Sequence, residues 1–290
     1  MNYEKLLEPM QKSSIRMDYT AIKECPVGYS KIGGKPDLPP DFEWFYYNGK
    51  IHDNGVNGHP LSFLAQINCE EAHKYDKDAL LPSKGMLYFF YELDSLAWGY
   101  DPKSKGSARV YYHPGSVSEL QRTDFPSDLP TGYQLPEIPI AFSDAKDLPS
   151  FEEFCEWHDK DDYGWEERYK YEDAKVKMGF DSELDDDIEE EPITKLLGYA
   201  DIVQNSMLLQ CEQVTNGIYW GEAVDVPETI LSQDKKNCKK WRLLFQLDSI
   251  FIDDYEIMMW GDMGRLFFYI KIDDLKAENF ENCWLILQCG

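Results

Sequence analysis

The chain has 290 residues, of which 43% are hydrophobic and 14% aromatic, and its formal net charge is −25. Because disordered chains contain few aromatic residues, this composition excludes intrinsic disorder and predicts a packed core. The negative charge would repel a phosphate backbone or an anionic membrane surface, so we expect neither nucleic acid nor membrane as a partner. A protein partner with a basic surface fits the charge.

Neither a targeting segment nor a disulfide framework is expected. Residues 1–10 lack the apolar core of a signal peptide, and no run of about 18 apolar residues is present. The seven cysteines are odd in number and contain no Cys-x-x-Cys pair, which is typical of reduced thiols. We therefore expect a cytoplasmic protein without a metal site or cofactor.

The first 113 residues predict mainly strands. Alternating apolar residues at 15–19 predict one strand, and Asn48-Gly49 favours a type I′ hairpin turn between 44–47 and 50–52. The other elements expected there are short helices at 3–12 and 69–78 and strands at 61–68, 86–93 and 108–113.

The middle of the chain predicts a loop followed by an acidic segment. Residues 114–150 are rich in Pro, Asp and Ser and predict a long loop. Ser150 and Glu153 form a capping box, which predicts the start of a helix. Residues 152–191 contain 18 acidic and 5 basic residues, about half of the net charge, so a solvated helical or loop insert is expected over about 150–191.

The C-terminal third again predicts strands. Apolar runs interrupted by turn residues recur there, and a short helix is expected at 273–278. The expected strands are 208–211, 218–220, 241–248, 265–272 and 283–289.

Two parts of the chain share an ordered set of features, which indicates an internal duplication. The matched stretches are Lys31–Gly34 with Lys195–Gly198, Phe63–Asn68 with Leu243–Asp248, and Gly85–Phe90 with Gly264–Tyr269. We expect a single α+β domain over 1–290, in which two diverged, mainly antiparallel β repeats pack about a pseudo-two-fold axis as one compact body with peripheral helices. The repeats would span about 15–115 and 192–290.

The same stretches carry a resemblance to a known family. Ser30–Pro39, Pro60–Asn68, Leu81–Phe90 and the ending through Met258–Phe268 and Trp284–Cys289 resemble the YwqG-like family of bacterial proteins. The chain departs from the family pattern at Trp44-Phe45, where members commonly have Trp-Pro. This family is a domain of unknown function, so the resemblance implies a fold and a cytoplasmic location but no reaction. The position of some relatives near toxin systems implies an immunity-like binding role.

Lys31, Gly33 and Gly34 form one candidate ligand site. Backbone N–H groups of a glycine pair beside a lysine can hold an anion. A tight turn explains the same residues, and the pattern is not a P-loop, because no Gly-Lys-Ser/Thr opens a helix.

Gln66, Gln246, Trp260 and Asp262 are the other candidates. The two glutamines would form a symmetric polar pair near the axis at a ligand cleft, or would be buried amides that bond the backbone. Trp260 and Asp262, next to flexible glycines, would line a pocket, or would belong to a hairpin turn whose Trp packs on the core.

The function that the sequence favours is that of a non-enzymatic binding protein. A cleft between the two repeats would hold a peptide, a protein or a small ligand. The alternative is an enzyme of unidentified reaction that uses Lys31, Trp260 and Asp262, or a Cys/His pair that meets only in the fold. A third option is that the acidic segment docks a basic partner.

Overall fold

Two antiparallel sheets dominate the computed structural model, which describes residues 2–19, 21–49, 58–160, 164–182, 184, 193–221, 225–253 and 255–290. The larger sheet has the strand order β11 (Ala141–Asp147), β1 (Lys12–Asp18), β12 (Lys195–Leu197), β13 (Trp241–Asp248), β16 (Arg265–Lys271) and β17 (Trp284–Gln288). The smaller has the order β10 (Ile138–Pro139), β2 (Lys31–Ile32), β6 (Ser62–Asn68), β7 (Met86–Tyr91) and β8 (Ala108–His113). The fold is α+β, as expected.

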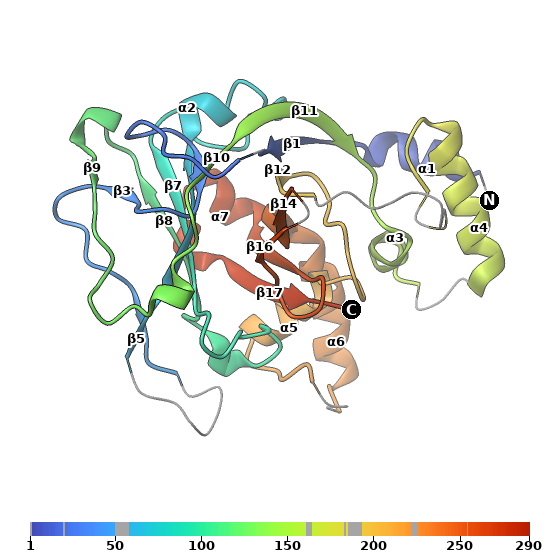
Figure 1. Cartoon of the computed structure of the whole chain (residues 1–290). Coiled ribbons are helices and arrows are strands. Elements are labelled where there is room, and N and C mark those ends of the chain that lie inside the picture. Colours follow the sequence, from blue (N-terminus) through green and yellow to red (C-terminus); the bar gives the residue numbers. More distant parts are fainter. Residues whose placement is uncertain are drawn as a thin grey trace.

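Short ribbons and helices complete the described elements. The three two-stranded ribbons are β3 (Asp37–Leu38) with β9 (Gln121–Arg122), β4 (Tyr46–Tyr47) with β5 (His59–Pro60), and β14 (Ile250–Ile252) with β15 (Tyr255–Met258). The α-helices are α1 (Tyr3–Leu7), α2 (Cys69–Ala72), α3 (Phe151–Trp157), α4 (Gly164–Lys177), α5 (Leu208–Thr215), α6 (Glu228–Asn237) and α7 (Ile272–Lys276). Figure 1 shows α1, α3 and α4 gathered at the end of the molecule opposite β8 and β9.

The two sheets pack face to face on one core. Phe89 of β7 lies 4.4 Å from Phe245 of β13 and 5.2 Å from Phe268 of β16, measured between ring centroids. The outer face of the larger sheet is covered by α5, and that of the smaller by the chain around Leu38 and Phe42. Because both faces of the central strands are covered, β6 and β7 are buried along their whole length, and sequence alternation alone does not show which face is inside.

The expected strand at 208–211 is wrong, because these residues begin helix α5. Buried side chains recur at the helical spacing, namely at Met207, Leu208, Cys211 and Val214, and they pack on the outer face of the larger sheet. A four-residue stretch with three apolar residues is too short to distinguish the helical period of 3.6 residues from the strand period of 2. Residues 218–220 also form no strand.

One further expectation on local structure is wrong, and another falls partly outside the described residues. The expected loop at 114–150 contains β11, a seven-residue edge strand paired with β1. Its residues are all at least partly exposed, so no apolar run marks it. Tyr46 and Tyr47, in the first arm of the expected hairpin, pair with Pro60 and His59. Residues 50–52 lie outside the described part of the chain.

We predict that Phe89→Ala lowers the free energy of unfolding by about 3–5 kcal/mol, because it leaves a cavity at the contact between the sheets. Val176→Ala is the control, since Val176 is 53% exposed on α4, and should change it by less than about 0.5 kcal/mol. Urea unfolding monitored by circular dichroism measures both. Similar effects of the two substitutions would contradict this packing.

Candidate functional site

Lys31 lies at the centre of a buried group that we call the first polar cluster, formed by Lys31, Asp37, Gln66 and Glu137. The Lys31 ammonium donates to the carbonyl of Lys35 at 2.6 Å and lies 3.3 Å from Glu137 Oε2 and 3.9 Å from Asp37 Oδ2. Burial lowers the pKa of Lys31 in spite of these carboxylates. Arg122 reduces their effect, because its side chain is paired with both of them.

A second polar cluster, formed by Asp147, Lys195, Asp201 and Gln246, has the same plan in the larger sheet. Lys195 lies 2.7 Å from Asp201 Oδ2 and 2.9 Å from Asp147 Oδ2. Burial opposes the charge of Lys195, but the two carboxylates together raise its pKa above the usual value.

The two clusters agree in their hydrogen bonds. Gln66 Nε2 donates to Asp37 Oδ2 at 2.7 Å, and its Oε1 accepts from the backbone N–H of Asp37 at 2.8 Å. Gln246 makes the same pair of bonds with Asp201, at 2.8 and 2.9 Å. Sequence reasoning missed both aspartates, although each follows its lysine by six residues, and that shared spacing is a signal that could have found them.

The two glutamines do not form a pair near an axis. Gln66 lies opposite Tyr88, whose ring belongs to the outer face of the smaller sheet. Gln246 lies opposite Phe267, whose ring is on the outer face of the larger sheet. The core between the sheets therefore separates them, and each amide bonds backbone and an aspartate within its own cluster.

The glycine pair forms a turn. The Gly33 N–H donates to the carbonyl of Leu64 at 2.8 Å, and the Gly34 N–H donates to that of Leu135 at 2.9 Å, so both donors are used within the fold, which favours the tight turn over the anion cradle. Both glycines have positive φ, at 57° and 66°, and a Cβ on Gly33 would lie 2.2 Å from a carbonyl oxygen.

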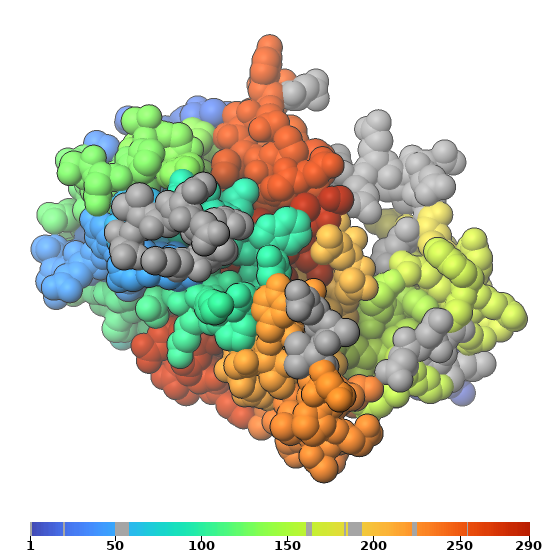
Figure 2. Space-filling view, turned by 90° about the horizontal axis from the view of Figure 1, so that it is seen from below, coloured from blue at the N-terminus to red at the C-terminus, as the bar shows by residue number. Residues whose placement is uncertain are grey.

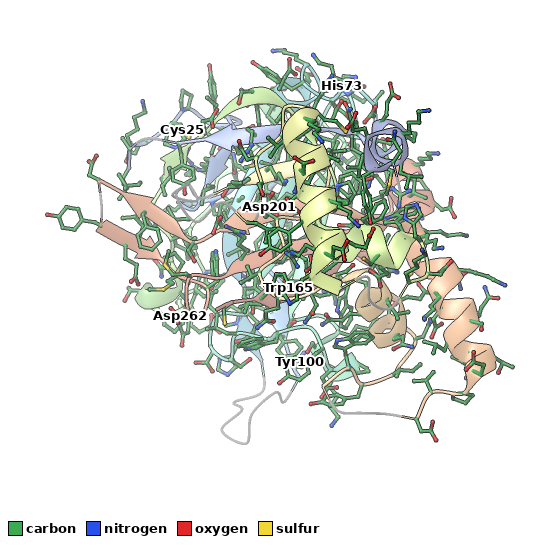
Figure 3. The ribbon with its side chains drawn as sticks, turned by 90° about the vertical axis from the view of Figure 1, so that its right-hand side faces the viewer. Cys25, His73, Tyr100, Trp165, Asp201 and Asp262 are labelled. Atoms are coloured by element: carbon green, nitrogen blue, oxygen red, sulfur yellow. The ribbon has the colours of Figure 1, made fainter. Side chains whose placement is uncertain are left out.

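Trp260 and Asp262 point to different surroundings. Trp260 is fully buried, and its Nε1 donates to the carbonyl of Asp248 at 2.9 Å. Asp262 is exposed in the turn that follows, and its carbonyl accepts from the N–H of Gly290. Figure 3 shows Asp262 apart from Cys25, which contacts Glu137 of the first polar cluster. The structure thus does not assemble Lys31, Trp260 and Asp262 into one site.

A cleft with a volume of about 470 Å³ lies between helices α3, α4, α5 and α6. This lies within the range of about 300–1,000 Å³ that is usual for ligand sites. Trp165 of α4 and Trp220 of the loop after α5 line it, and they are 68% and 38% exposed. No sequence motif marked this cleft. The acidic insert forms two of its walls, and the cleft does not lie between the two sheets, where the core fills the space.

Helix α4 presents Trp165 to the cleft because its other side is buried. Tyr171 and Ala174 pack on α1 and α3, and the Tyr171 hydroxyl donates to the carbonyl of Pro149. Glutamates in the first turn and lysines in the last complement the helix dipole. The tryptophan therefore lies on the solvent side of a stable helix.

Helix α3 supplies the carboxylates of the cleft. Glu152 and Glu156 are one helical turn apart and line it together. Glu152 is paired with Arg168, and Glu156 accepts from the Ser206 hydroxyl and, at 2.8 Å, from the N–H of Leu209. Burial raises the pKa of Glu156 in spite of these donors. Asp159 also lines the cleft, as do Lys160, Arg168 and Lys235, so the cleft combines aromatic walls with charged groups of both signs.

Glu153 faces away from the cleft, toward the larger sheet. It is 4% exposed, and burial raises its pKa to about 7, opposed by the nearby Lys12 and Arg242. Lys12 lies 3.5 Å from the Tyr199 ring centroid, and burial lowers its pKa to about 8. These groups hold α3, and with it one wall of the cleft, on the sheet.

The cysteines of the described chain are free, and most have unreactive surroundings. Burial raises the pKa of the Cys25, Cys69 and Cys238 thiols to about 12, and it raises that of Cys211 and Cys283 further. A nucleophilic cysteine needs the opposite shift. Within the described ranges, no three His, Cys, Asp or Glu side chains gather as metal ligands, and no helix there is long and apolar enough to cross a membrane.

Comparison with known proteins assigns the family. The profile described as "Domain of unknown function (DUF1963)" matches residues 30–289, and the chain belongs to this family. No match was found among curated proteins.

We predict that Lys195→Met lowers the free energy of unfolding by about 3 kcal/mol, because it leaves Asp147 and Asp201 without their buried cation. The control is Lys177→Met, which removes an exposed ion pair with Asp173 and should cost less than about 1 kcal/mol. Chemical denaturation at neutral pH measures both, and equal losses would show that the second cluster contributes no more than a surface pair.

We predict that Glu153 makes stability fall with rising pH. Its pKa in the folded chain, about 7, is above the ordinary 4.5, so the stabilisation is complete below pH 4.5 and is lost as the pH rises through about 7. Relative to Glu153→Gln, the wild-type chain should lose about 3 kcal/mol of unfolding free energy between these values. Parallel pH profiles of the two proteins would refute this.

Proposed function

We propose that this member of the DUF1963 family is a protein-binding protein that takes a positively charged segment of its partner into the cleft between α3, α4, α5 and α6. One observation carries the proposal. Trp165 and Trp220 come from separate parts of the chain, and both expose large aromatic surface into the same cleft. Exposed Trp side chains are enriched at protein interfaces, where their burial contributes much of the binding energy.

The aromatic walls suit cationic side chains. A guanidinium group stacks on the face of a Trp ring and gains about 0.5–2 kcal/mol. The chain itself uses this contact, because Arg168 lies 5.8 Å from the Trp165 ring centroid and Arg242 lies 5.3 Å from that of Trp157. A partner's arginine could stack in the same way on the exposed parts of Trp165 and Trp220.

The charge of the chain supports a basic partner. The net charge is −25, and residues 152–191, which include α3 and α4, carry 18 acidic and 5 basic residues. Such a field attracts a cationic segment and raises its association rate. Three of these acids, Glu152, Glu156 and Asp159, line the cleft beside Lys160, Arg168 and Lys235, so the attraction comes from the chain as a whole.

We also infer that the scaffold is an internal duplication related by a pseudo-two-fold axis, with repeats at about 15–115 and 192–290. The strand series β2-β6-β7-β8 and β12-β13-β16-β17 have the same order and antiparallel pairing. Each has a register shift at the same place, between Phe63 and Ala65 and between Leu243 and Phe245. The corresponding residues Phe89 and Phe268 contact each other.

We also infer from the motifs quoted above that, within the family, the chain is a YwqG-like protein. A cytoplasmic location suits its free cysteines. An immunity-like role, in which a toxin's basic segment is the partner, is compatible with the cleft. The acidic segment is then part of the binding surface and is an addition to the duplicated scaffold.

We predict that an array of random peptides of about 15 residues, probed at about 150 mM salt, retains mainly cationic sequences. The double variant Trp165→Ala, Trp220→Ala should lose about tenfold or more in affinity for them. Tyr255→Ala is the control, because Tyr255 is 74% exposed on β15 and lies outside the cleft, and it should bind as the wild type does. Retention of anionic peptides, or no loss in the double variant, would refute the proposal.

A further inference from the structure

A second aromatic surface adjoins the cleft at Trp220. The N–H of Trp220 donates to the carbonyl of Tyr100 at 2.9 Å. The ring of Tyr100, which is 36% exposed, lies 5.7 Å from that of Tyr219 at 83° between the planes. We call Tyr100 and Tyr219 the tyrosine platform. Figure 2 shows the segment near residue 100, in teal, against the segment near 220, in orange.

The segment that carries Tyr100 is bonded to the last strand of the larger sheet. The carbonyl of Trp98 accepts from the N–H of Leu287 at 3.1 Å, and that of Gly99 accepts from Trp284 Nε1 at 2.8 Å. Gly99 has φ of 79°, and a Cβ there would lie 1.9 Å from the carbonyl oxygen of Leu285. Only glycine allows this approach, so the segment that carries Tyr100 packs directly against β17.

Trp220 therefore belongs to two neighbouring aromatic surfaces. Its side chain lines the cleft with Trp165, and its backbone N–H is bonded to the carbonyl of Tyr100 in the tyrosine platform. Figure 2 shows the teal segment near residue 100 apart from the yellow-green α4, with orange residues between them. A partner segment seated in the cleft would pass over Trp220 onto this platform.

We propose that the tyrosine platform is a second subsite of the same binding surface, and that it takes an arginine of an extended segment whose neighbouring arginine occupies the cleft. This inference rests on the proposed function. Two separate aromatic surfaces either side of Trp220 suit an extended segment, whose side chains reach outward at intervals, better than a helix that needs one continuous apolar groove.

Arginine fits both subsites better than lysine does. Its planar guanidinium is weakly hydrated and stacks on aromatic faces, whereas the lysine ammonium is a compact, strongly hydrated charge. Attraction to the acidic chain as a whole is the same for both residues. A preference for arginine over lysine at equal charge therefore reports on the aromatic rings and not on the net charge of −25.

The test uses two fluorescein-labelled peptides of about nine residues, one alternating Arg and Gly and one alternating Lys and Gly, titrated with the full chain at about 150 mM salt, with fluorescence anisotropy as the readout. We expect the Arg peptide to bind at least about fivefold more tightly. Tyr100→Ala with Tyr219→Ala should remove most of this preference. Tyr219→Lys should also remove the preference for the Arg peptide. Because Tyr219 is a half-buried surface residue, this substitution leaves the core unchanged. Tyr255→Ala should have no effect.

Equal affinity for the two peptides, or a preference that survives both platform variants, would overturn the inference. In that case, loss of binding in the Trp165 and Trp220 double variant would still support the proposed function. If neither the platform nor the cleft variants weaken either peptide, both proposals fail. Circular dichroism of each variant confirms that it is folded before its affinity is compared.

Discussion

The contact between the two sheets is the constraint on which the rest of the structure depends. Phe89, Phe245 and Phe268 bring the inner faces together, and this leaves two outer faces that must also be covered. The larger sheet is covered by α5, whose buried side packs on Trp241 and Phe267, and the smaller by the irregular chain after β2. Because α5 lies there, the loops at either end of it reach the region of α3 and β17. The cleft and the tyrosine platform both form along those loops.

The two polar clusters pair lysines that are buried because both faces of each sheet are covered. Lys31 and Lys195 begin the short strands β2 and β12 and are both buried, and a buried ammonium group is costly unless it is paired. In each case an aspartate six residues later and a glutamine on the neighbouring strand complete the bonding. These contacts tie the chain that leaves the short strand back to the sheet. Because these hydrogen bonds are directional, they fix the register of β2 on β6 and of β12 on β13. The ion pairs also neutralise the charge of each lysine.

The acidic segment is attached to this scaffold through α3. One side of α3 buries Phe151 and Phe154 among α1 and α4, a second directs Glu153 toward the sheet, and a third places Glu156 in the cleft. A single seven-residue helix thus links the scaffold to the surface for which we propose a binding role. The ionisation of Glu153 near neutral pH would affect both the stability of the chain and the position of one cleft wall.

The amino-acid sequence by itself determined the α+β class, the central strands, the Ser150 cap, whose hydroxyl accepts from the N–H of Glu153, and the matched lysines and glutamines, because local periodicity and spacing along the chain encode these features. It did not determine that 208–211 is helical or that 141–147 is an edge strand, since a short apolar run and an exposed polar strand have no distinctive period. It also did not show which face of β6 or β13 lies inside, so Gln66 and Gln246 were expected together although the core separates them. Only the tertiary structure brought Trp165, Trp220 and Tyr100 to one surface, because residues so far apart in sequence meet through packing alone.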